Sequence, residues 1–334
     1  MSVSWALYVQ GKRARVRWIE RKERAMRFLR YCGMAAALAV MLSFGGCAPF
    51  VQGADHAASE SAAREEEAAV FTEDSRISDV MRTEVFAPYG RLLFPVQRGY
   101  MDGDTLASQA VAGKQIFYPI YTEEEMRRDP AKRDTGLFFF RGRAGAPVAI
   151  CNAGGGFAYV GAMQDSFPHA LALSKKGYHA FALIYRPGAQ TACEDLARVI
   201  AFVHEHAAEL GVDAAGYALW GGSAGVRMAA WFVSFGTEAF GERPYPRPAA
   251  VILQYMGLSE VYGNEPPTYS CVGTADGIAS WRTMQRRTEA IEWNGQAAQI
   301  EIFPGLPHGF GLGEGTGAEG WLDCATDFWE EHRR

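Results

Sequence analysis

One serine stands among small residues in the run Gly-Gly-Ser-Ala-Gly at 221–225. An apolar segment precedes the run and a helical pattern follows it, so we expect a sharp strand-to-helix turn. Larger side chains beside Ser223 would clash in such a turn. The turn would project the hydroxyl from the sheet edge, where the helix N-terminus stabilises developing negative charge. Ser223 is therefore a candidate nucleophile. The alternative is a glycine-rich turn that binds a phosphate or only packs closely.

A serine hydroxyl needs a base, and the base needs a carboxylate to orient it. Two histidines follow Ser223 in the chain, His308 and His332. His332 lies among charged residues near the C-terminus, whereas His308 lies in a glycine-containing loop directly after the last expected strand. A single aspartate, Asp276, stands between Ser223 and His308, just after the expected strand at 268–272. We expect His308 to be the base and Asp276 its partner, although alone each could be an ordinary turn or loop residue.

A glycine triplet at 154–156 follows the expected strand at 147–151. Consecutive glycines let backbone N–H groups converge on one point, which suits the oxyanion of a tetrahedral intermediate. We expect the N–H of Gly155 or Gly156 to act together with that of Ala224. A phosphate-binding loop is the alternative, but no Lys-Ser/Thr follows and the dinucleotide spacing G-x-G-x-x-G is absent. This chemistry requires no metal and no organic cofactor.

Residues near these motifs are weaker candidates. Phe157 and Tyr159 follow the glycine triplet, and Met256 follows an expected strand. Each could contact the substrate's acyl group, and each could equally be plain packing. Arg186 follows another strand, and we expect it to pair with a carboxylate.

The elements that must position these residues alternate between strands and helices. We expect strands at 147–151, 179–185, 217–220, 249–254, 268–272 and 299–303, and helices at 169–176, 193–210, 226–235, 278–293 and 321–332. Strands that are apolar throughout, alternating with helices, predict a mainly parallel sheet covered on both faces. Residues 81–146 are less regular, and alternations at 91–96 and 115–121 suggest an antiparallel hairpin at the sheet edge.

Over residues 147–332 the chain resembles the α/β-hydrolase superfamily, specifically its bacterial esterase-like, acetyl-esterase-like branch. The resemblance rests on four ordered motifs: GGGF at 154–157, GGSAG at 221–225, GTAD at 273–276 and PHGFG at 307–311. It implies a triad of Ser223, His308 and Asp276 and hydrolysis of carboxylic esters. Many relatives place His or Pro before the glycines, where this chain has Ala153.

Composition and charge limit the other possibilities. The chain has 334 residues, of which 49% are hydrophobic and 21% charged. These values exclude a wholly disordered, collagen-like or small disulfide-stapled protein. Residues 1–46 hold nine Lys/Arg and two Asp/Glu, whereas the remainder holds 24 and 36. An acidic body without a basic cluster argues against nucleic acid as a partner.

The N-terminus is interpreted as a targeting signal. Residues 34–46 are apolar or small, basic residues precede them, and Cys47 follows. This order is typical of a secretory signal, and Cys47 would be the lipidated residue of a bacterial lipoprotein. Met26 would open a compact signal, so our hypothesis is that translation starts there. Ordinary cleavage or an uncleaved anchor is the alternative, and residues 47–80 are expected to form an acidic, disordered tether.

These observations predict an exported, cell-envelope enzyme, or alternatively a secreted or periplasmic one, with its catalytic α/β-hydrolase domain at 81–334. We expect a serine carboxylesterase acting on small short-acyl esters, including acetylated sugars. Membrane contact is expected only through the lipid anchor. The rival interpretations are a serine peptidase of the same fold and a catalytically silent binding protein. Cys151, Cys193, Cys271 and Cys324 are expected to be buried thiols and not disulfides or metal ligands.

Overall fold

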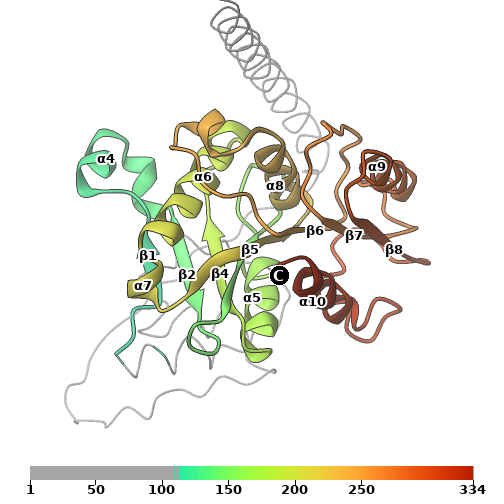
Figure 1. Cartoon of the computed structure of the whole chain (residues 1–334), viewed down its shortest axis with the longest axis horizontal. Coiled ribbons are helices and arrows are strands. Elements are labelled where there is room, and N and C mark those ends of the chain that lie inside the picture. The colour runs from blue at the N-terminus through green and yellow to red at the C-terminus, as the bar shows by residue number, and fades with distance from the viewer. Residues whose placement is uncertain (1–108, 110–112, 334) are drawn as a thin grey trace, which may run out of the picture.

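A mostly parallel sheet forms the centre of the computed structural model, which describes residue 109 and residues 113–333 (Figure 1). Within that part of the chain the sheet has eight strands in the order β1-β2-β4-β3-β5-β6-β7-β8. Their bounds are β1 Phe117–Pro119, β2 Gly136–Phe140, β3 Pro147–Asn152, β4 His179–Ile184, β5 Asp213–Gly222, β6 Ala250–Gln254, β7 Thr268–Gly273 and β8 Ala298–Phe303. The pairings from β4 through β8 are parallel, and β1 and β2 add antiparallel pairs at one edge.

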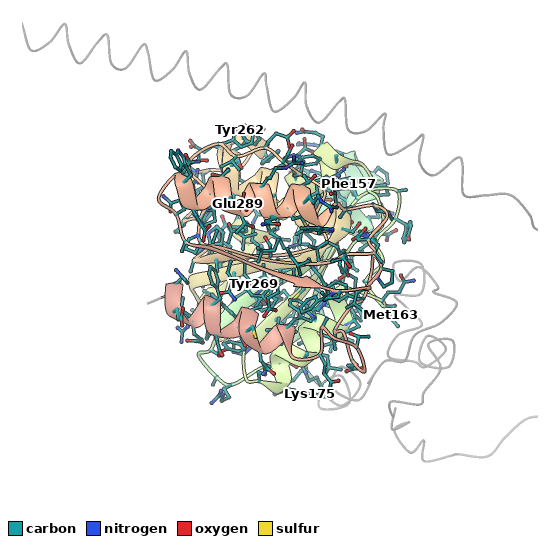
Figure 2. All side chains as sticks on the ribbon, turned by 90° about the vertical axis from the view of Figure 1, so that its right-hand side faces the viewer. Phe157, Met163, Lys175, Tyr262, Tyr269 and Glu289 are labelled. Atoms are coloured by element: carbon teal, nitrogen blue, oxygen red, sulfur yellow. The ribbon has the colours of Figure 1, made fainter. Side chains whose placement is uncertain are left out.

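Helices cover both faces of this sheet. Helices α5 (Ser166–Lys175) and α10 (Trp321–His332) lie on one face, and α6 (Ala189–Glu205), α8 (Ser223–Phe235) and α9 (Trp281–Trp293) lie on the other (Figure 1). Figure 2 views the sheet edge-on, with Glu289 of α9 on one side and Lys175 of α5 on the other. The remaining elements are α4 (Glu123–Arg128), α7 (Ala207–Leu210) and the 3₁₀ turns Pro130–Asp134 and Thr237–Phe240.

Burial on both faces explains why the inner strands are mainly apolar. Every residue of β3, β4, β6 and β7 is buried, as expected for parallel strands with helices above and below. The helix α6 carries its buried residues at helical spacing, including Leu196, Val199, Ile200 and Val203. The predicted parallel sheet with helices on both faces is confirmed.

The order of the strands creates a switch point between β3 and β5. From β3 the chain passes through α5 to β4 on one side, and then through α6 to β5 on the other side. The connections therefore leave from opposite faces, and a crevice opens at the carboxyl ends of β3 and β5. The glycine triplet follows β3 and Ser223 follows β5, so both meet at this crevice.

Several expectations need correction. Strand β2 was not predicted, and it is β2 that pairs antiparallel with β1, whereas the expected hairpin partner at 91–96 lies outside the described residues. The helix expected at 193–210 is broken at His206 into α6 and α7. Cys151, Cys193 and Cys271 are buried free thiols, but Cys324 is exposed because it lies on the solvent side of α10.

A buried ion-pair network links the sheet edge to α6. Arg186 lies 2.7 Å from Asp195 and 2.8 Å from Asp129, and the Asp195 side chain is fully buried. The Tyr121 hydroxyl donates to the same aspartate at 2.5 Å. Burial raises the pKa of Asp195, and the bonds from Arg186 and Tyr121 oppose that rise. The expected pairing of Arg186 with a carboxylate is confirmed, and its role is to join the first strands to the parallel core.

The expected signal at 1–46, the start at Met26, the lipidated Cys47 and the tether at 47–80 all lie outside the described residues and stay predictions. Within residues 113–333, no helix combines the length and the apolar content that crossing a membrane requires.

Candidate active site

The turn between β5 and α8 holds Ser223 in an unusual backbone conformation. Its φ of 52° lies in the left-handed region, which costs free energy for a residue with a side chain. The neighbouring glycines allow the turn: a Cβ on Gly221 or on Gly225 would lie 2.1 Å from the carbonyl oxygen of Asn152. The expected clash at the flanking positions is therefore real, and its source is the end of β3.

The hydroxyl of Ser223 is in hydrogen-bond contact with His308, which comes from the loop after β8. The distance from His308 Nε2 to Ser223 Oγ is 2.9 Å. The other ring nitrogen, Nδ1, lies 2.8 Å from Asp276 Oδ2. A carboxylate only accepts hydrogen bonds, so Nδ1 carries the proton and Nε2 is left as an acceptor. The imidazole is thus set up to take the proton of Ser223.

Asp276 is fixed by the turn after β7. Its side chain is fully buried, and its Oδ1 accepts the backbone N–H groups of Ile278 at 2.8 Å and Ala279 at 2.7 Å. Since Oδ2 is bonded to His308, both oxygens are occupied and the carboxylate cannot rotate without losing bonds. The ring of Tyr255 also packs against the His308 ring, with the two centroids 4.7 Å apart, and this contact restrains the imidazole.

The glycine triplet lies directly against the serine. A Cβ on Gly154 would be 3.0 Å from the Cβ of Ser223. Gly155 and Gly156 have φ values of 130° and 62°, and within the described residues neither N–H donates a hydrogen bond. No side chain caps the first turn of α8, which leaves the N–H of Ala224 available too. Among the described residues these N–H groups therefore have no competing acceptor, and the pairing of Gly155 or Gly156 with Ala224 around an oxyanion stays a prediction.

A buried carboxylate that sequence reasoning missed supports this loop. Asp165, 8% exposed, accepts the Gly154 N–H through Oδ2 at 2.6 Å. Its Oδ1 lies 3.1 Å from His169 Nδ1, although the two atoms are not aligned as a hydrogen bond. The Tyr185 hydroxyl donates to the Ala153 carbonyl at 2.8 Å on the same loop. Asp165 and Tyr185 both contact this loop, and no sequence signal identified Asp165, because its burial depends on the packing of α5.

Replacing Asp165 by alanine is expected to lower kcat for 4-nitrophenyl acetate by at least about tenfold, with a smaller change in KM. The Gly154 N–H would lose its acceptor, and the glycine loop would no longer be held in place. In other enzymes, loss of one aligned oxyanion donor lowers kcat by about 10²- to 10³-fold. Asp165→Asn keeps an oxygen that can accept the Gly154 N–H, so its kcat should lie between that of Asp165→Ala and that of the native protein. Kinetics corrected for the folded fraction test this, and an unchanged kcat would leave Asp165 with a structural role only.

Of the three residues expected to contact the substrate, one is exposed and two are buried. Tyr159 is 43% exposed beside the glycine loop. Phe157 is 8% exposed and stacks on Trp231 with ring centroids 5.8 Å apart, and Met256 is 1% exposed. Contact with substrate stays a prediction for all three. Among residues 113–333, no group of three His, Cys, Asp or Glu side chains is arranged to hold a metal ion.

Comparison with known proteins identifies the fold. The BD-FAE family model, which describes an α/β-hydrolase family, matches residues 141–242. The matched segment contains the glycine triplet and Ser223 but ends before Asp276 and His308. No curated protein matches the sequence.

Three solved structures similar to this chain are described as esterases or hydrolases. A propionate-bound esterase from Thermogutta terrifontis is 23% identical, with a TM-score of 0.55 over 64% of this chain and 93% of that one. An acetyl ester-xyloside bifunctional hydrolase from Caldicellulosiruptor lactoaceticus is 21% identical, with a TM-score of 0.56 over 64% and 95%. An α/β hydrolase from a Medee basin deep-sea metagenome is 19% identical, with a TM-score of 0.51 over 60% and 93%. This chain has the α/β-hydrolase fold.

Proposed function

We propose that the chain is a serine carboxylesterase that works through an acyl-enzyme. The observation that carries the proposal is the continuous contact from Ser223 through His308 to a fully buried Asp276, with Ser223 Oγ 2.9 Å from the imidazole. The same chemistry is hosted by the α/β-hydrolase fold, but a fold alone does not assign an activity. The proposal therefore rests on the site.

In the first half-reaction, Ser223 Oγ attacks the ester carbonyl while His308 Nε2 takes the hydroxyl proton. The carbonyl oxygen becomes an oxyanion, which accepts hydrogen bonds from the N–H groups of Gly155 or Gly156 and Ala224. His308 is now an imidazolium, and Asp276 offsets its charge. The C–O bond to the alcohol breaks as His308 returns the proton to that oxygen, and the acyl group stays on Ser223.

In the second half-reaction, His308 takes a proton from water, and the resulting hydroxide equivalent attacks the acyl carbonyl. The oxyanion forms again in the same cradle. His308 then protonates Ser223 Oγ, the acyl bond breaks, and the carboxylic acid leaves. The enzyme returns to its starting state without a cofactor taking part.

Short acyl groups are the proposed substrates. Phe157 is buried directly after the glycine triplet, with its ring centroid 5.8 Å from that of Trp231 and 6.4 Å from that of Tyr185, and we infer that this packed aromatic cluster limits the length of the acyl chain. Two of the similar structures are described as propionate-bound and as an acetyl ester hydrolase, and we extend that preference to this chain, including acetylated sugars. The signal-like segment and Cys47 extend the proposal to an exported, membrane-tethered enzyme.

Hydrolysis of a series of 4-nitrophenyl esters tests the proposal. We expect kcat/KM to be highest for acetate and propionate and to fall by at least about tenfold by octanoate, because each added methylene must fit beside a packed aromatic ring. Acetylated xylose should release acetate. A folded protein that hydrolyses none of these esters above the buffer rate would instead be a silent hydrolase-like binder. Cleavage confined to peptide substrates would favour the serine peptidase.

A further inference from the structure

An arginine lies on the same helix face as the candidate nucleophile. Arg227 is four residues after Ser223 on α8, so the two residues are one helical turn apart and face the same way. Side chains on a helix lean toward its N-terminus, which brings the Arg227 stem back toward the turn that carries Ser223. Arg227 is half-buried, so the residue keeps some contact with solvent.

The guanidinium of Arg227 lies against the loops that hold the rest of the triad. A Cβ on Gly257 would be 3.1 Å from Arg227 Nη2, so the missing side chain of Gly257 leaves the guanidinium its place. This Cβ position on Gly257 is also 3.8 Å from the Ile278 carbonyl oxygen and 3.9 Å from the Ala279 Cα. The backbone N–H groups of those two residues hold Asp276. Arg227 therefore belongs to the catalytic edge of the sheet.

Among the described residues, no group compensates this charge. Within residues 113–333, Arg227 makes no ion pair, hydrogen bond or ring contact. By contrast, Arg186, Arg198, Arg243 and Arg333 all pair with carboxylates. An arginine that is half-buried and unpaired is better explained by a ligand than by the fold.

We propose that Arg227 binds a carboxylate carried by the ester substrate, which rests on the proposed esterase function. The substrates would be acyl esters with a carboxylate within a few bonds of the scissile carbonyl, on either the acyl or the alcohol side. Arginine suits this role because its planar fork matches a carboxylate with two parallel hydrogen bonds. Ile278, 74% exposed, and Tyr159, 43% exposed, offer apolar surface at the same edge for the body of the substrate.

Paired substrates test this inference. On the alcohol side, 4-acetoxybenzoate is compared with 4-acetoxybenzamide; on the acyl side, mono-4-nitrophenyl adipate is compared with its primary amide. The quantity measured is the ratio of kcat/KM for the acid to that for the neutral amide. We expect a ratio of at least about ten in one pair, as a charge-assisted hydrogen bond should give, and that pair identifies the side that carries the carboxylate.

Arg227→Gln should lower that ratio by at least about tenfold, and Arg227→Lys, which keeps the charge but not the fork, should lower it less. Arg127→Gln is the matched control, because Arg127 is an exposed arginine on α4 at the far edge of the sheet. It removes the same charge and should leave the ratio at the native value.

Two results would overturn the inference while leaving the esterase proposal intact. One is a native ratio of one or less in both pairs, which decides the matter even if the glutamine variant does not fold. The other is an equal ratio in the native protein and in folded Arg227→Gln. Failure to hydrolyse any ester, 4-nitrophenyl acetate included, would remove the esterase function and this inference with it.

Discussion

Ser223→Ala should reduce kcat for 4-nitrophenyl acetate by at least about 10⁴-fold. Without Oγ no acyl-enzyme can form, and only the oxyanion donors and substrate binding remain to accelerate attack by water. The fold should be unaffected, because alanine is smaller than serine and the glycines on either side already avoid the Asn152 carbonyl. Steady-state kinetics with a limit of detection well below the expected residual rate provide the measurement.

Ser234→Ala is the matched control for this variant. Ser234 lies on the same helix, is buried, and donates its hydroxyl to the Ala230 carbonyl at 2.9 Å. Its removal alters α8 without touching the site, so activity should be retained. If Ser223→Ala keeps more than about one per cent of native kcat, Ser223 is not the nucleophile, since loss of a triad serine costs far more.

Asp276→Asn should lower kcat by about 10⁴-fold, nearly as much as loss of the nucleophile. An asparagine that keeps the two backbone bonds from Ile278 and Ala279 through its oxygen turns its amide nitrogen toward His308. That nitrogen only donates, so His308 Nδ1 must become the acceptor and the proton moves to Nε2. The imidazole then points an N–H at Ser223 Oγ and cannot take its proton.

Asp213→Asn is the control for the second variant. Asp213 Oδ1 accepts the Ala215 N–H at 2.9 Å in a similar local turn, but at the start of β5 and away from the catalytic edge. It should leave kcat at the native level. Full activity of Asp276→Asn in the assay with 4-nitrophenyl acetate would mean that the 2.8 Å contact with His308 has no catalytic role.

The site could be predicted from the sequence because its residues follow strands. Ser223, Asp276 and His308 follow the strands β5, β7 and β8, and parallel strands bring their carboxyl ends to one edge. The order of the strands could not be derived, since nothing local in the sequence states that β5 pairs with β3 and not with β4.

The residues that sequence reasoning missed act through contacts distant in the chain. Asp165 supports Gly154 from the start of α5, and its burial depends on the packing of α5 against β3. Strand β2 was missed although its run Gly-Leu-Phe-Phe-Phe is apolar and fully buried, and it pairs with β1 along one edge and with β4 along the other. No sequence pattern singled out Arg227, because its place beside Gly257 and its lack of a carboxylate partner among the described residues depend on the tertiary fold.

Labelling with a fluorophosphonate, followed by peptide mapping, tests the central claim most directly. The reagent phosphonylates a serine only when its hydroxyl is activated by a base. We predict one adduct, on Ser223 of the native protein, and its loss in His308→Ala. A folded protein that takes up no label, or whose label maps to another residue and persists in Ser223→Ala, would contradict the account.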